Sequence, residues 1–192
     1  MYSLEAVAIA AMLAGSANPT APALPGGIIA WIVCNGRKRN PIGGWLLFYY
    51  WQLWSGLLLS AAFFSINIQS YVPENFDSGS RFALFLASAV PGLVLLLAQM
   101  VVATMLLSVR APDMLNLLRW ILAAQVLAGL LGVIIDAKYF PDNQVFSIFA
   151  FIEELLWLAY FFKSTRVRHI FSLQDWDVAV NSIYPPKLNL ST

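Results

Sequence analysis

Long apolar runs separated by short polar segments dominate the chain. Four of these runs cover residues 42–68, 82–108, 114–135 and 144–162. A helix that crosses the hydrocarbon core of a bilayer needs about 20 predominantly apolar residues, and each of the four runs supplies them. The pattern therefore predicts four transmembrane helices joined by short loops.

A further apolar run, residues 4–34, is interrupted by Pro19, Pro22 and Pro25. Proline removes a backbone hydrogen bond, so a helix broken there must be covered by neighbouring helices rather than face lipid. We expect one kinked or partly unwound span, with a re-entrant segment or a cleaved signal sequence as alternatives. Glu5 and the absence of basic residues at the start disfavour a signal sequence.

The fold class that follows is an all-α polytopic transmembrane helical bundle with five spans. The chain divides into residues 1–40 (first span and basic junction), 41–171 (four-helix core) and 172–192 (a cytoplasmic tail, surface-lying or disordered). Asn40 and Pro41 suit the N-cap and first-turn positions of the second span.

Turn and breaker residues mark the remaining boundaries. Residues 110–113 read Arg-Ala-Pro-Asp, which predicts a tight turn between the third and fourth spans. Asp142 is expected to cap the last span, and Pro91 is expected to kink the third.

Basic residues are distributed unequally between the two sides of this bundle. With the N-terminus outside, the inner side carries Arg37, Lys38, Arg39, Arg110, Arg119, Lys163, Arg166, Arg168 and Lys187. The outer side carries Arg81 and Lys138, with the carboxylates Glu74, Asp77, Asp136 and Asp142. Lysine and arginine favour the cytoplasmic side of short loops, so the C-terminal tail is predicted to be cytoplasmic.

Composition narrows the function classes. The chain is 60% hydrophobic and 11% charged, with a net charge of +1, which argues against a nucleic-acid partner. Cys34 and His169 are the only residues of their types, so an internal disulfide and metal sites built from Cys or His pairs are excluded. The sequence also lacks the common catalytic motifs. We expect no enzyme activity and no cofactor.

Glu153 and Glu154 stand inside the last span, about 13 Å along the helix axis from Lys163. An ionised carboxylate facing lipid at that depth costs several kcal/mol, so at least one must face the bundle or a partner chain. The pair is either a proton relay or cation site, or a structural hydrogen-bonded carboxyl pair.

Three glutamines, Gln52, Gln99 and Gln125, lie within the second, third and fourth spans at depths that can reach Glu153. Amides inside membranes usually bond across helices for about a kcal/mol or less. A cluster of amides and carboxyls can instead bind a small polar ligand or conduct protons. The sequence leaves both interpretations open.

The inner basic residues have two interpretations as well. A collar that binds the headgroups of anionic lipids would use Arg37, Lys38, Arg39, Arg119, Lys163, Arg166 and Arg168. Ordinary topology determination explains the same residues. Arg119, inside the fourth span, is expected to snorkel to the headgroups, to pair with Glu154 or to hold a lipid phosphate.

Two stretches carry a family resemblance. Residues 41–47 read PIGGWLL, and residues 157–171 read WLAYFFKSTRVRHIF. Together they resemble the bacterial membrane proteins catalogued as domain of unknown function 2569, over about residues 41–171. The resemblance implies a four-span core in the bacterial cytoplasmic (inner) membrane, and it implies no activity.

Three hypotheses follow for function. The first is a non-enzymatic accessory or structural subunit of a larger membrane complex, with lipids and other membrane-protein subunits as partners. The second is a small transporter or proton-coupled carrier that uses Glu153 and Glu154 with the three glutamines. The third, a lipid-modifying enzyme at the inner face, has only the basic residues in its favour.

Overall fold

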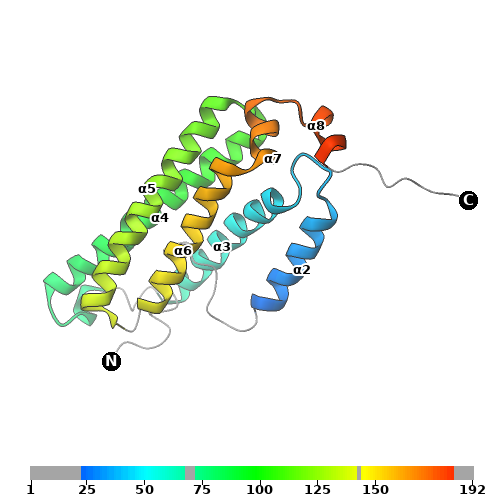
Figure 1. The fold of residues 1–192 in the computed structure, drawn as a ribbon. Helices are drawn as coiled ribbons and strands as arrows, with labels where there is room; N and C mark the ends of the chain where they lie inside the picture. The colour runs from blue at the N-terminus through cyan, green and yellow to red at the C-terminus, as the bar shows by residue number, and fades with distance from the viewer. Residues whose placement is uncertain (1–22, 68–71, 142–143, 184–192) are drawn as a thin grey trace, which may run out of the picture.

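A computed structural model describes residues 23–67, 72–141 and 144–183, and every regular element in these ranges is helical (Figure 1). The elements are α2 (Ala23–Gly36), α3 (Trp45–Asn67), η2 (Pro73–Asn75), α4 (Gly79–Val109), α5 (Pro112–Tyr139), α6 (Gln144–Lys163), α7 (Thr165–Val167), η4 (Arg168–Ser172) and α8 (Trp176–Ile183).

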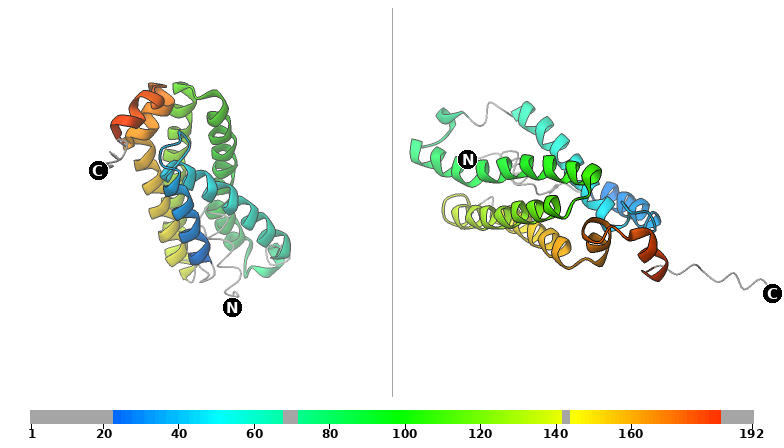
Figure 2. Two further views of the ribbon diagram at one scale, coloured as in Figure 1. Left: turned by 90° about the vertical axis from the view of Figure 1, so that its right-hand side faces the viewer. Right: turned by 90° about the horizontal axis from the view of Figure 1, so that it is seen from above.

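Three long helices, α4, α5 and α6, form the body of the bundle. They pack side by side, with α5 between α4 and α6. α3 meets them near its N-terminal end and diverges from α4 toward its C-terminal end (Figure 2). α2 packs mainly on α3. The bends between α2 and α3, between α4 and α5, and after α6 all lie at one end of the bundle, together with α8.

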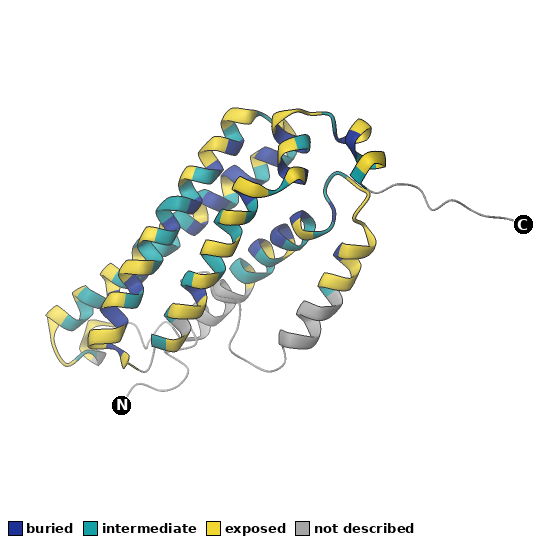
Figure 3. Cartoon of the chain, viewed as in Figure 1, coloured by how far each residue is buried: buried dark blue, intermediate teal, exposed yellow. Residues whose placement is uncertain are grey.

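The middle stretches of the long helices α4 and α5 turn apolar side chains outward and their glutamines inward. Exposed positions on α4 are Leu86, Val90, Val94, Leu97, Val101 and Met105, and those on α5 are Leu117, Trp120, Leu127, Leu130, Leu131 and Ile134 (Figure 3). Gln99 and Gln125, on the same two helices, are buried. This distribution is the reverse of a water-soluble helix, which turns its apolar stripe to the core.

Two helices of the described part of the chain, α4 and α5, are long and apolar enough to cross a membrane. Less than a third of the most apolar stretch of each is buried, whereas the core helix of a soluble protein is mostly buried. The five spans expected from the sequence stay a prediction. The first part of the span expected over residues 4–34 lies outside the described residues. The cap expected at Asp142 also lies outside them.

The start of α3 differs from the prediction. Asn40 and Pro41 do not open the helix, which begins at Trp45. Residues 37–44 instead fold back on the end of α2, where the Gly44 amide donates to the Cys34 carbonyl over 2.8 Å. Gly44 has φ +57°, and a side chain at Gly43 would collide with the Arg37 carbonyl. The two glycines therefore permit a loop that capping preferences alone do not reveal.

The turn between α4 and α5 agrees with the prediction. Arg110 ends α4 in the left-handed conformation, and its amide donates to the Leu106 carbonyl over 3.1 Å. Ala111 then precedes Pro112 at the first position of α5. Proline suits this position because its missing N–H would lack a helical partner anyway.

Two segments expected to be loop or tail are helical. Asp136, expected in an outer loop, lies inside α5, is buried, and accepts a hydrogen bond from Ser147 of α6. The tail contains α8, which buries Trp176 and Ala179. Because the Trp176 indole donates to the Arg39 carbonyl over 3.1 Å, the segment is anchored to the α2–α3 loop.

Arg166 of α7 fastens this end of the bundle. It is 7% exposed, and its guanidinium donates to the carbonyls of Lys38, Asn40 (2.8 Å) and Pro41 (3.3 Å). The guanidinium also lies over the Trp176 ring, 4.4 Å from its centroid. Arg166 thus joins α8 and the segment after α6 to the α2–α3 loop, from which it is separated by more than a hundred residues.

We predict that Arg166→Ala opens this junction. Removing a charged donor from several buried carbonyls should lower stability by about 2–4 kcal/mol, seen as a lower unfolding temperature in detergent. Cys34, the sole cysteine, is buried beside the loop, so its labelling by a maleimide should accelerate. Arg168→Ala, at an exposed position, is the control. Equal labelling rates in the two variants would contradict the role of Arg166 in holding the α2–α3 loop closed.

Candidate functional site

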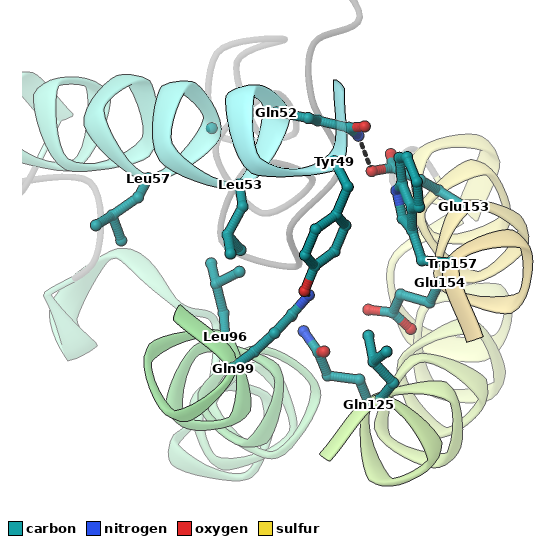
Figure 4. A pocket seen from close by; sticks show the side chains of 12 residues that line it. Tyr49, Gln52, Leu53, Leu57, Leu96, Gln99, Gln125, Glu153, Glu154 and Trp157 are labelled. Carbon is teal, nitrogen blue, oxygen red and sulfur yellow. Dashed lines mark hydrogen bonds between the residues drawn. The ribbon is translucent and has the colours of Figure 1, made fainter. Parts of the chain in front are cut away.

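The polar residues singled out in the sequence surround one cavity. It has a volume of about 40 Å³ and lies between α3, α4, α5 and α6 (Figure 4). Its lining comprises Tyr49, Gln52, Leu53, Gly56, Leu57, Leu96, Gln99, Leu122, Gln125, Glu153, Glu154 and Trp157. The structure therefore brings together all three glutamines and both glutamates, which come from four different helices.

Two hydrogen bonds connect α3 to the opposite walls of the cavity. The Gln52 Nε2 group donates to Glu153 Oε1 of α6. The buried Gln99 of α4 donates through Nε2 to the Tyr49 hydroxyl over 2.7 Å. Figure 4 shows Tyr49 pointing across the cavity from α3 toward Gln99. Both amides therefore serve as links between helices, as expected for amides inside a membrane.

Glu154 turns to a different neighbour from Glu153. Adjacent helical residues point about 100° apart, so Glu153 reaches α3 while Glu154 reaches α5. The carboxyl group of Glu154 lies against Gly129, where an added Cβ would collide with Oε2. Gly129 therefore supplies the space in which the Glu154 carboxyl sits.

Two buried oxygen atoms at the cavity have no hydrogen-bond partner within the described part of the chain. They are Glu154 Oε2 on α6 and Gln125 Oε1 on α5. Gln125 is only 3% exposed. An unsatisfied buried polar group costs about 1–3 kcal/mol, so a donor, a proton or a cation at this position would remove a real cost.

An apolar core closes the cavity toward the basic end of the bundle. Leu46, Leu106, Leu115, Leu118 and Phe161 are fully buried there. The Tyr49 ring also packs edge-on against Trp157 and Phe161, with centroids 5.0 and 4.8 Å apart. Water or an ion in the cavity is thus separated from that end by packed side chains.

Sequence reasoning missed two residues of the site, Tyr49 and Gly129. Both lie one turn from a glutamine that was recognised, Tyr49 before Gln52 and Gly129 after Gln125. Helical spacing of three or four residues places such pairs on one face. That spacing was the available signal, but tyrosine and glycine are too common in membrane helices to stand out without it.

The headgroup candidates all lie at the end of the bundle that carries the α2–α3 loop. Arg37, Lys38, Arg39, Lys163 and Arg168 are exposed there. Arg166 is a correction, because its buried guanidinium is engaged by backbone carbonyls and Trp176. Its guanidinium cannot bind a headgroup without leaving these partners.

Arg119 has a structural partner. Its Nε and Nη2 atoms donate to the Phe161 carbonyl over 3.0 and 2.9 Å, and it lies 5.1 Å from the centroid of the Phe162 ring. The carbonyls of the last helical turn lack helical donors, so Arg119 caps α6. In this structure it therefore serves the helix end rather than Glu154.

Comparisons of the chain with protein family models, curated proteins and solved structures give no significant match. The resemblance of residues 41–171 to the family of unknown function accordingly stays a prediction.

We predict that Gly129 and Glu154 are energetically coupled. Gly132→Ala, where the new Cβ meets only the Ser88 carbonyl at 3.9 Å, should stabilise α5 by up to about 1 kcal/mol because alanine favours helix. Gly129→Ala should gain less, because the Glu154 carboxyl must move. Unfolding temperatures in detergent would measure both.

The double variant provides the test of coupling. In a Glu154→Ala background, Gly129→Ala should recover the full gain seen at Gly132. Strict additivity of the two changes would show that the carboxyl does not rest on Gly129.

Proposed function

We propose that this chain is a small integral membrane carrier that passes protons or a small polar solute through a site at Glu153 and Glu154. The observation that carries the proposal is the cavity itself. Three amides and two carboxyls meet about halfway along α5 while the outward helix faces are apolar. Ionisable groups within membrane helices commonly mark such pathways.

The membrane location is part of the proposal. Exposed leucine, valine and tryptophan side chains cover α4 and α5, and lipid solvates such surfaces without the cost that water imposes. The basic end of the bundle would face the cytoplasm. We infer five spans, an extracytoplasmic N-terminus and the bacterial inner membrane, in keeping with the family resemblance.

Helix packing suggests which part of a carrier would move. α5 packs extensively on both α4 and α6, whereas α3 touches α4 over a much shorter length and diverges from it. Carriers commonly rock one group of helices against another around a central site. Because Gln52 and Tyr49 belong to α3, movement of this helix would remake both hydrogen bonds across the cavity.

An accessory or structural subunit of a larger complex is the second proposal. The observation in its favour is α2, which packs mainly on α3 and exposes Trp31, Ile32 and Val33. Gentle extraction followed by mass spectrometry would identify a partner subunit. A chain recovered alone, with no partner and no retained lipid, would count against this proposal.

We predict that Glu154→Gln abolishes transport by the reconstituted protein. The neutral amide cannot take up and release a proton, so proton flux in proteoliposomes, followed with a pH-sensitive dye, should fall to the level of empty vesicles. Glu153→Gln should reduce proton flux less, because the Glu153 carboxyl already accepts a hydrogen bond from Gln52.

Glu74→Gln is the matched control, since Glu74 is an exposed carboxylate in η2 and should leave flux unchanged. If the double variant of Glu153 and Glu154 transports like the unaltered protein, the carrier proposal fails.

The membrane topology has its own prediction. Fusions at the C-terminus should be active with a cytoplasmic reporter and inactive with a periplasmic one, because the basic residues concentrate at that end. The chain should also stay in the pellet after alkaline extraction of membranes. Release into the supernatant would contradict membrane insertion.

A further inference from the structure

We propose that the cavity binds one monovalent alkali cation in exchange for a proton on Glu154. This rests on the proposed function in that it names the charge carrier of the same site. The exchange is balanced: the Glu154 carboxylic acid loses its proton to solvent, and the resulting carboxylate pairs with the entering cation. No bond other than the O–H bond is broken.

Two unpartnered oxygens supply the first argument. Gln125 Oε1 and Glu154 Oε2 reach the cavity from neighbouring helices and, among the described residues, accept no hydrogen bond. Gln125 Oε1 is an acceptor, and Glu154 Oε2 is an acceptor when its carboxyl is ionised, so in that state both can be satisfied only by a donor or a positive charge. Gln125, being 3% exposed, cannot turn to bulk solvent for one.

The charge of the lining supplies the second argument. Among the described residues that line the cavity, the only ionisable groups besides a tyrosine are Glu153 and Glu154. Arg119, the basic residue one turn before Leu122 of the lining, is engaged by the Phe161 carbonyl. The site therefore attracts cations and repels anions.

The number of free carboxylates limits the charge of the occupant. Glu153 is already paired with the Gln52 amide, which leaves Glu154 as the principal anionic ligand. Calcium takes six to eight oxygen ligands, usually with several carboxylates, and within the described part of the chain no group of three or more Asp, Glu, His or Cys could hold a metal ion. One carboxylate with neutral amide and hydroxyl oxygens suits a single positive charge.

The volume of the cavity agrees with a small occupant. A water molecule needs about 10–15 Å³ of such space, so 40 Å³ admits a cation with one or two waters. The same oxygen, Glu154 Oε2, would hold either the proton or the cation. Because both would occupy this one oxygen, which lies against Gly129, the two occupants exclude each other.

The experiment measures cation binding by the purified full chain in detergent. Thermal unfolding is followed in choline chloride and during replacement of choline by sodium, lithium or potassium at constant ionic strength. We expect a saturable stabilisation by one or more alkali cations. Where the protonated carboxyl predominates, its apparent Kd should rise about tenfold for each unit by which the pH is lowered, because each cation displaces one proton. A pH indicator in weakly buffered solution should register that proton.

Variants identify the ligands. Glu154→Gln should abolish the cation-dependent stabilisation, and Gln125→Leu should weaken binding at least about tenfold, as loss of a metal-supporting group commonly does. Glu74→Gln should bind as the unaltered chain does. If the glutamate and glutamine variants fail to fold, Gly129→Ala, which favours helix but displaces the carboxyl, should still fold and bind more weakly.

Two results would overturn the proposal: equal stability in choline and in every alkali cation, or a cation effect that survives unchanged in Glu154→Gln or Gly129→Ala. Its failure can be distinguished from that of the carrier. Glu154-dependent proton flux without any cation effect would support a proton carrier and refute cation binding. Cation binding without flux in proteoliposomes would support the cation site and refute the carrier function.

Discussion

Polar side chains on a helix with an apolar exterior can be accommodated only where another helix faces them. In lipid no water is available to satisfy them, so each polar group needs a partner on a neighbouring helix. The largest gathering of such groups in the described part of the bundle is at the cavity, where Gln52, Gln99, Gln125, Glu153 and Glu154 meet. Four of the helices thereby contribute side chains to one cavity.

The helices themselves were largely predictable from the sequence. Apolar runs fix α4, α5 and α6 to within a few residues, because the physical requirement for a span is a length of apolar chain. The meeting of the glutamines with Glu153 was also predictable, since matching depths leave few places for them to go. The position of a residue along its helix does not determine which neighbouring helix its side chain faces. That Glu154 faces α5 depends on the absence of a side chain at Gly129, which is a feature of packing.

The features that escaped prediction are those made by backbone groups and distant partners. The start of α3 was placed too early because Gly43, Gly44 and the carbonyls taken by Arg166 decide it. For the same reason the helix α8, within a tail expected to be surface-lying or disordered, was not predicted, although Trp176 anchors it. A basic residue after a span has the same sequence signature whether it faces headgroups or backbone, and only burial distinguishes the two roles.

The contacts of Arg166 also constrain the order of assembly. Its partners Asn40 and Pro41 are made 126 and 125 residues earlier, so during synthesis the α2–α3 loop leaves the ribosome long before the side chain that holds it. The contacts between this loop and Arg166 can therefore form only after the last long helix has been made. A chain that ended before Arg166 would retain most of its apolar helices, but it would lack the side chain that joins the α2–α3 loop to the segment after α6.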